Sequence, residues 1–256
     1  MVHGWGDTSA SFQFVVDALQ RDWRVHALDW RGFGKSEWNA GTYWYPDYFA
    51  DLDAWLSAIS PEAPVRLVGH SMGGTVASVY AGVRPERITA FVNLDGGGLR
   101  RPPHSEAPGR IRKWLGQLTG ERTGRVYPDR AAFAARLMGD NPRLTKARAD
   151  FLAGEVTLEC EGGVCFALDP AHYWRNPVYF SIEDALAAWR EITAPVPWVT
   201  AQHSFVTRFM EEHHEDYRDR LASFRNLHQV HLEDSGHNVH HDQPERVAAL
   251  IEEFFG

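Results

Sequence analysis

The sequence predicts an α/β fold in which a mostly parallel sheet carries helices on both faces. Two observations point to this fold. Short apolar runs alternate with helical patterns through most of the 256-residue chain. One apolar run, Val65–Val68, continues through Gly69-His70-Ser71-Met72-Gly73 into a second helical pattern. Strands that alternate with helices are typical of a parallel sheet that is covered on both sides.

Apolar periodicity defines the elements of the first part of the chain. In order, we expect a helix over 9–19, a strand over 24–28, a helix from Pro46 to Ile59, a strand over 65–68, a helix over 75–83 and a strand over 88–94 that ends at Asp95.

The alternation stops between about Leu99 and Ile192. Here short helical patterns follow one another, at 109–118, 128–138, 141–153 and 181–192, and aromatic residues are frequent. Afterwards the alternation resumes, with a strand at 197–201, a mostly helical stretch at 205–224, a strand at 229–232 and a helix at 245–254. We therefore expect residues 99–192 to form a helical cap, inserted into a core made of residues 1–98 and 193–256.

The composition excludes several classes of protein. Hydrophobic residues make up 44% of the chain and charged residues 23%, as in a folded globular protein. A formal net charge of −8 disfavours nucleic acid as a partner. No apolar run reaches membrane-spanning length, and no charged-then-apolar signal opens the chain. We expect a cytoplasmic protein with no membrane partner, and the sequence does not indicate its oligomeric state.

Ser71 stands at the apex of a sharp turn from strand to helix. Such a turn strains the backbone of its central residue, so the residues two before and two after it must lack a bulky Cβ atom. Gly69 and Gly73 meet this requirement. The turn presents Ser71 Oγ at the end of the strand, and it places the N–H of Met72 at a helix N-terminus, where negative charge is favoured.

Four motifs make the chain resemble the α/β-hydrolases over essentially its whole length. They are His3-Gly4-Trp5, Asp29-x-Arg31-Gly32-x-Gly34-x-Ser36, Gly69-His70-Ser71-Met72-Gly73-Gly74 and Gly236-His237-x-x-His240-His241-x-Gln243-Pro244-Glu245. The resemblance implies the α/β-hydrolase fold and a mainly structural role for the loop that begins at Asp29. It does not specify a substrate.

The resemblance also implies a set of catalytic residues, which this family places in the order serine, acid, histidine. Ser71 matches the nucleophile, and His237, after the last strand, matches the general base that activates it. Backbone N–H groups of Trp5 and Met72 match the oxyanion hole.

The acid departs from the common family pattern. Most members carry it after the strand that corresponds to 197–201, where this chain has Ser204. A second arrangement places it after the strand that follows the nucleophile turn, which is the position of Asp95. Both positions lie at the carboxyl edge of the sheet, and we expect Asp95 to be the acid that orients His237. Three other carboxylates remain as alternatives, with Asp95 then a strand-end cap: Asp234, Glu211 and Glu212.

The sequence indicates no cofactor and no metal. The spacing His237-x-x-His240-His241 resembles a ligand set, but no carboxylate or cysteine completes it in a fitting place. We interpret His240 and His241 as loop residues, and His3 as a residue that packs beneath the site.

The two cysteines flank a glycine pair in Cys160-Glu161-Gly162-Gly163-Val164-Cys165. If the glycines form a two-residue hairpin loop, the two cysteines face each other across the strands. Two reduced thiols are nevertheless the expected state of a cytoplasmic protein.

In this family the strand before His3-Gly4 is central, between the strands at 24–28 and 65–68. The chain supplies only Met1-Val2 of it, so the N-terminal strands look truncated. A missing central strand leaves unpaired backbone groups on both of its neighbours. Either residues upstream of Met1 complete the strand, or the flanking strands pair directly or the fold is impaired. We expect the first.

These features predict a serine hydrolase that cleaves an ester, thioester or similar acyl bond through an acyl-enzyme. The aromatic residues of the expected cap favour a small to medium apolar substrate, although they equally fit simple packing of the cap. Two alternatives remain: a hydrolase of the same fold that cleaves a carbon–carbon bond, and a non-catalytic protein that binds a small molecule.

Overall fold

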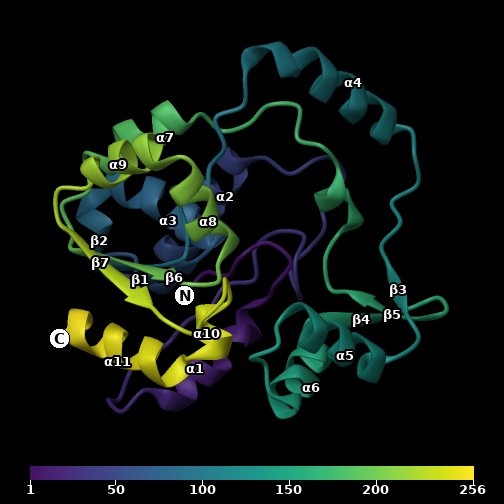
Figure 1. Ribbon diagram of the computed structural model, residues 1–256, viewed down its shortest axis with the longest axis horizontal. Coiled ribbons are helices and arrows are strands. Elements are labelled where there is room, and N and C mark those ends of the chain that lie inside the picture. The colour runs from purple at the N-terminus through teal and green to yellow at the C-terminus, as the bar shows by residue number, and fades with distance from the viewer.

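The computed structural model describes residues 1–256, and its main sheet is parallel (Figure 1). The sheet has the order β1-β2-β6-β7. Its strands are β1 (Val65–His70), β2 (Ile88–Leu94), β6 (Val196–Ala201) and β7 (Leu227–Leu232). Every neighbouring pair runs parallel. The predicted α/β fold is therefore confirmed.

Helices cover both faces of this sheet (Figure 1). On one face, α1 (Gln13–Ala18) and α11 (Pro244–Phe255) share a buried apolar cluster with alternate residues of the strands. On the other face, α2 (Tyr45–Ile59), α3 (Met72–Val83) and α7 (Ile182–Trp189) form the largest buried cluster. The strands are thus buried from both sides, as their apolar sequences require.

The other elements are shorter or lie in the predicted insertion. They are the 3₁₀ helices η1 (Ser9–Phe12), η2 (Pro85–Arg87), η3 (His104–Glu106) and η4 (Pro170–Tyr173), the helices α4 (Ala107–Leu118), α5 (Arg130–Asp140), α6 (Lys146–Glu155), α8 (Phe205–Glu212), α9 (His214–Ala222) and α10 (Val239–Asp242), and the strands β3 (Val126–Tyr127), β4 (Thr157–Cys160) and β5 (Gly163–Phe166). No helix is both long and apolar enough to span a bilayer.

Residues 99–192 are not all helical. Strands β3, β5 and β4 form a small antiparallel sheet, and α5 and α6 pack with it around Phe133 in a separate buried cluster. In contrast, α7 packs on α3, where the indole N–H of Trp189 donates to Ser78 Oγ over 2.8 Å. The assignment of the whole segment as a cap therefore stays a prediction, because its last helix belongs to the core cluster.

Capping residues explain two differences from the expected helix boundaries. The helix expected over 141–153 begins only at Lys146, because the hydroxyl of Thr145 accepts the N–H of Arg148. The helical stretch expected over 205–224 is divided into α8 and α9 at His213, whose backbone is not helical.

The prediction of a strand over 24–28 was wrong. The segment has only an isolated parallel bridge between Leu28 and Val2. Val2 also pairs with β1, since its N–H donates to Val68 O over 2.9 Å and its carbonyl accepts the N–H of His70 over 3.0 Å. Segment 24–28 and β1 do not pair with each other directly. A continuous ladder needs a neighbouring strand along its whole length, and Val2 supplies one residue of it.

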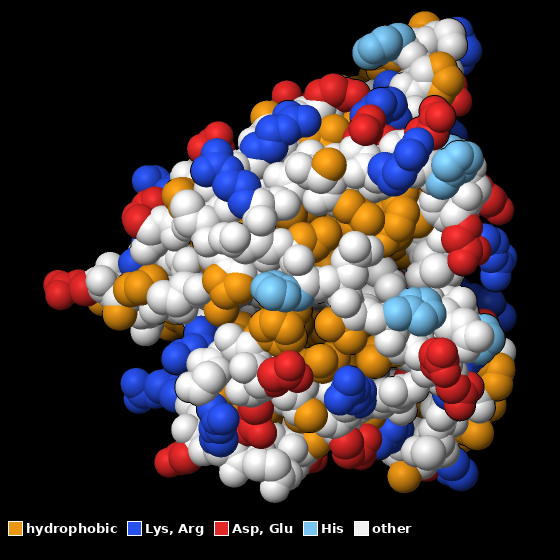
Figure 2. All heavy atoms as spheres, turned by 60° about the vertical axis from the view of Figure 1, so that its left-hand side comes forward, with side chains coloured by type: hydrophobic (Ala, Val, Ile, Leu, Met, Phe, Trp, Pro, Cys, Tyr) orange, Lys and Arg blue, Asp and Glu red, His pale blue; other side chains and the backbone are white.

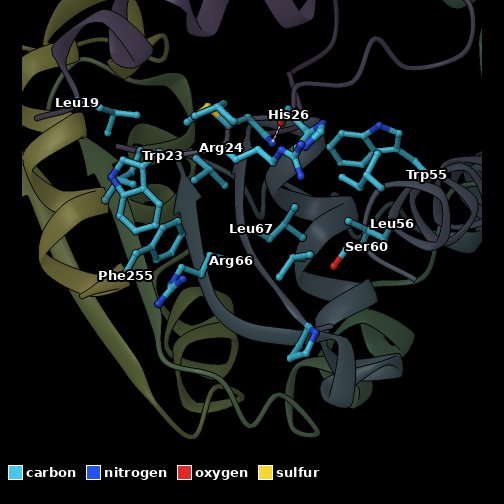
Figure 3. A pocket seen from close by; sticks show the side chains of 17 residues that line it. Leu19, Trp23, Arg24, His26, Trp55, Leu56, Ser60, Arg66, Leu67 and Phe255 are labelled. Carbon is cyan, nitrogen blue, oxygen red and sulfur yellow. Dashed lines mark hydrogen bonds between the residues drawn. The ribbon is translucent and has the colours of Figure 1, made fainter. Parts of the chain in front are cut away.

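Beyond Val2, a cavity of about 330 Å³ separates segment 24–28 from the amino end of β1. Figure 3 shows its lining, which is mainly apolar and includes Trp23, Trp55, Leu67 and Phe255. The space beside the amino end of β1 is therefore mainly apolar.

The β4–β5 hairpin forms at the glycine pair, but its register differs from the expected one. Cys160 pairs with Gly163, and Cys165 pairs with Leu158. The two cysteines are therefore diagonal rather than opposite, and both are free thiols. The expectation that they face each other directly was wrong, because the two-residue loop is Glu161-Gly162.

The loop that begins at Asp29 makes structural contacts. The carboxylate of Asp29 accepts the N–H groups of Ser9 and Lys35, which joins the loop to η1. Arg31 donates two hydrogen bonds, of 2.7 and 2.6 Å, to Asp51 of α2. These contacts fix the loop beneath the carboxyl edge of the sheet.

Candidate active site

Ser71 stands in a strained turn between β1 and α3. Its backbone has φ 52° and ψ −116°, in a region that side chains other than glycine rarely adopt. A Cβ at Gly69 would lie 2.7 Å from the carbonyl oxygen of Gly73, and a Cβ at Gly73 would lie 2.6 Å from the carbonyl oxygen of His3. Both glycines are therefore required by close backbone contacts, as the motif predicts.

The structure brings together the three side chains that the sequence analysis singled out. His237 Nε2 lies 2.8 Å from Ser71 Oγ, and His237 Nδ1 lies 2.6 Å from Asp95 Oδ2. Asp95 is fully buried, while the side chain of His237 is 22% exposed. One continuous line of hydrogen bonds thus runs from a buried carboxylate to the serine hydroxyl.

Ser204 is a residue of this site that the sequence analysis did not assign. Its hydroxyl donates to Asp95 Oδ2, and its Oγ accepts the N–H of Val206 at the start of α8. The Ser204 hydroxyl thus links the backbone of α8 to the Asp95 carboxylate. The signal was present in the sequence, since Ser204 occupies the loop in which the resemblance to the α/β-hydrolases leads us to expect an acid.

The alternative acids lie elsewhere. Asp234 is 91% exposed at its side chain and lies 3.5 Å from the guanidinium of Arg143. Glu211 and Glu212 are exposed at the end of α8. None of these three carboxylates has a hydrogen bond with His237.

Trp5 and Met72 line the same pocket. Met72 is the first residue of α3, so its N–H has no partner within the helix. Glycine at position 4 lets the N-terminal loop approach the serine closely, because a Cβ there would lie 3.0 Å from the Cβ of Ser71. The two expected oxyanion donors therefore belong to the N-terminal loop and to the first turn of α3.

Two buried histidines support these loops in their neutral form. His3 accepts the N–H of Trp30 at Nε2 and donates to the carbonyl of Gly4 through Nδ1. His70 donates through Nε2 to the carbonyl of His237 over 2.9 Å. Burial lowers the pKa of His3 and holds the pKa of His70 well below its usual value. His3 thus packs beneath the site, as expected.

His240 and His241 are not loop residues, because they lie in the short helix α10 and are buried. A carboxylate does lie near these two histidines, contrary to the expectation that none would complete a ligand set there. Asp7, from the loop that follows Trp5, lies beside both imidazoles. Sequence spacing does not show this arrangement, because Asp7 is far from α10 along the chain.

Two cavities lie near the proposed catalytic residues, and Trp5 lines both. One, of about 170 Å³, is lined largely by aromatic residues, namely Trp5, Tyr43, Trp44, Tyr45, Tyr48, Trp114 and Trp174. The other, of about 300 Å³, includes polar groups such as Arg136, Asp140 and His237. Hydrophobic side chains also gather in the hollows of the face that Figure 2 shows, among residues of both charges.

A family model described as the alpha/beta hydrolase fold matches residues 1–244 of this chain. The chain belongs to the α/β-hydrolase-fold family. The match covers the serine turn, the strand that ends at Asp95 and the loop of His237, so the family's motifs and the site coincide.

Individual relatives agree with this family. A protein of Danio rerio named serine hydrolase-like protein is 30% identical over 263 residues, which covers 99% of this chain and 79% of the relative. A pimeloyl-[acyl-carrier protein] methyl ester esterase of Aeromonas hydrophila is 35% identical over 94 residues, 37% of this chain and 35% of its own. The thioesterase domain from the curacin biosynthetic pathway superposes with a TM-score of 0.86 at 25% identity, over 98% of this chain and 89% of its own. These relatives support hydrolase activity.

Proposed function

We propose that the protein is a serine hydrolase that cleaves an ester, thioester or similar acyl bond through an acyl-enzyme. One observation carries the proposal: the unbroken contact from Ser71 Oγ to His237 Nε2 and from His237 Nδ1 to Asp95. A serine hydroxyl needs such a base to become a nucleophile at neutral pH.

The proposed reaction assigns one task to each group. Ser71 Oγ attacks the acyl carbon while His237 takes its proton, and the buried carboxylate of Asp95 stabilises the imidazolium that forms. The N–H groups of Trp5 and Met72 donate to the oxyanion of the tetrahedral intermediate. His237 then protonates the leaving group, and water hydrolyses the acyl-enzyme by the same steps in reverse order.

The cavities support an apolar group on the substrate. The aromatic pocket of about 170 Å³ contains both oxyanion donors in its lining, so it is placed to take the group next to the reacting carbonyl. The polar cavity beside His237 offers Arg136 for an anionic or polar group on the other side of the bond. Two relatives are named for acyl bonds, a thioester and a methyl ester, which supports this bond class.

The proposal is tested with p-nitrophenyl esters and acyl thioesters of increasing chain length. We expect a burst of p-nitrophenol and a mass increase of one acyl group on the peptide that carries Ser71. A preference for medium or aromatic acyl groups would agree with the aromatic pocket. Turnover without an acyl adduct, or turnover that survives Ser71→Ala, would contradict the mechanism.

A further inference from the structure

Asp7, His240 and His241 form a compact cluster beside the proposed catalytic residues. Asp7 Oδ2 lies 3.5 Å from His240 Nε2 and 3.9 Å from His241 Nε2. One possible ligand atom from each residue lies within 4.8 Å of the other two, and all three residues are buried. The cluster joins two segments that are far apart in the sequence, the N-terminal loop and α10.

The cluster contains polar atoms that the chain leaves unsatisfied. Asp7 Oδ2 and His241 Nε2 are buried and have no hydrogen-bond partner. His240 Nε2, the ring nitrogen that faces Asp7, lies 3.2 Å from Ser11 Oγ, and His240 Nδ1 has no partner. No lysine or arginine pairs with Asp7, whose ion-pair neighbours are the two imidazoles. A buried polar atom without a partner is destabilising, so such a group calls for an ion, a proton or a water.

We propose that Asp7, His240 and His241 bind a divalent transition-metal ion such as Zn²⁺. Two imidazole nitrogens and one carboxylate oxygen are ligands that this class of ion prefers. Ligand atoms that surround a tetrahedral zinc ion at its usual bond lengths lie about 3.4 Å apart. The distances of 3.5 and 3.9 Å from the Asp7 oxygen need only small side-chain movements to reach this value.

An ion has a path to this site. Asp7 and His241 both line the polar cavity of about 300 Å³, which leaves a fourth coordination position for water on that side. A three-residue site with an open position binds more weakly than a closed structural site, so we expect exchangeable rather than permanent metal.

The site is connected to the proposed catalytic residues on two sides. Asp7 follows Trp5, the expected oxyanion donor, by two residues. The ring of His240 packs on His70 at 4.3 Å between centroids, and His70 holds the carbonyl of His237. A metal ion that draws Asp7 and His240 together therefore displaces the loop that carries Trp5 and the loop that carries His237. This part of the inference rests on the proposed function, and it predicts reversible inhibition by zinc.

Binding is tested without reference to turnover. The chelator-treated Ser71→Ala protein is titrated with Zn²⁺ by calorimetry, and Asp7→Asn and His241→Gln are introduced separately in that background. We expect one Zn²⁺ per chain, with affinity at least about tenfold lower in each variant, as loss of one ligand predicts. His231→Gln, which changes an exposed histidine, is the matched control and should bind as before.

Three results would overturn the site: no saturable binding, binding that Asp7→Asn and His241→Gln leave unchanged, or binding that His237→Gln abolishes while they do not. If circular dichroism shows that a variant does not fold, the protein with the unsubstituted cluster is titrated with Co²⁺ instead. We then expect a visible absorption band of tetrahedral Co²⁺ that Zn²⁺ removes. The absence of this band counts against the site. Acyl-enzyme formation by chelated protein tests the proposed function independently, so the two failures are distinguishable.

Discussion

The two ends of strand β1 differ in how the chain surrounds them. At its carboxyl end, Val2 pairs with Val68 and His70, and a Cβ on Gly73 would collide with the carbonyls of Val2 and His3. At its amino end, no segment pairs with β1 on that side, and a cavity of about 330 Å³ adjoins it. One residue of central strand is thus enough to set Gly4 beside Ser71. We expect chemistry to depend on the first end and stability on both.

The largest effect should come from breaking the carboxyl end at its buried acid. Asp95→Asn keeps the shape of the side chain but presents an amide to His237, which favours the wrong tautomer. We expect kcat to fall about 10⁴-fold with the fold intact. Steady-state kinetics on an activated ester measures this effect, with Asp234→Asn as the exposed control. Near-normal kcat in Asp95→Asn would remove Asp95 from the proposed mechanism.

Gly73→Ala should disrupt the backbone contact between α3 and the N-terminal loop. The new Cβ meets carbonyl oxygens of Val2 and His3, which cannot rotate away. Such overpacking costs about 1–3 kcal/mol, and moving the Trp5 N–H should cost about 10²-fold in kcat. Urea unfolding and kinetics measure the two effects. Gly109→Ala, at a position of α4 with open space, is the control: it should leave kcat unchanged and should not lower the free energy of unfolding, because alanine favours a helix more than glycine does. A fully active Gly73→Ala would show that this contact does not position the oxyanion donor.

Ser204→Ala tests the hydrogen bond that sequence reasoning missed. Loss of a bond to a charged acceptor costs about 1.5–3 kcal/mol, so we expect kcat to fall about 10- to 100-fold. Ser204→Thr keeps the hydroxyl and should restore most of the activity. If Ser204→Thr and Ser204→Ala have the same kcat, Ser204 acts through packing rather than by orienting Asp95.

Leu67→Ala enlarges the cavity at the other end of β1. We expect the free energy of unfolding to fall by about 2–5 kcal/mol, because a buried leucine is removed beside an existing void. The kcat of the folded protein should stay close to that of wild type. A large loss of kcat at a temperature where Leu67→Ala is folded would show that the two ends of β1 are coupled.

The smallest effect we expect is a loss of stability at acidic pH. His3 is buried and its pKa is lowered, so the folded state resists protonation that the unfolded state accepts near pH 6.5. The free energy of unfolding should therefore fall as the pH drops below 6.5, by at most about 1.4 kcal/mol per pH unit for this group. His3→Gln should flatten this dependence in urea titrations at pH 7 and 5.5. An unchanged slope would mean that other groups account for it.

The sequence predicts the carboxyl end of β1 better than the amino end. The glycines around Ser71 and the strand-to-helix turn are local signals, and they indicated both the turn and its close contacts. Asp95 and His237 were assigned through the resemblance to the α/β-hydrolases, and the parallel sheet explained how both reach one edge. The relation of Asp7 to α10 and the role of Ser204 depend on contacts between distant segments. Segment 24–28 has a strand-like sequence, yet it lacks the neighbour that would make it one.

The central claim is that Ser71, activated through His237, is the nucleophile. The most direct test is labelling by a fluorophosphonate probe, which reacts with an activated serine, with site assignment by mass spectrometry. We expect wild type to be labelled at Ser71, Ser71→Ala to remain unlabelled, and Asp95→Asn to be labelled much more slowly. An unlabelled wild-type protein, or a label on another serine, would contradict the account.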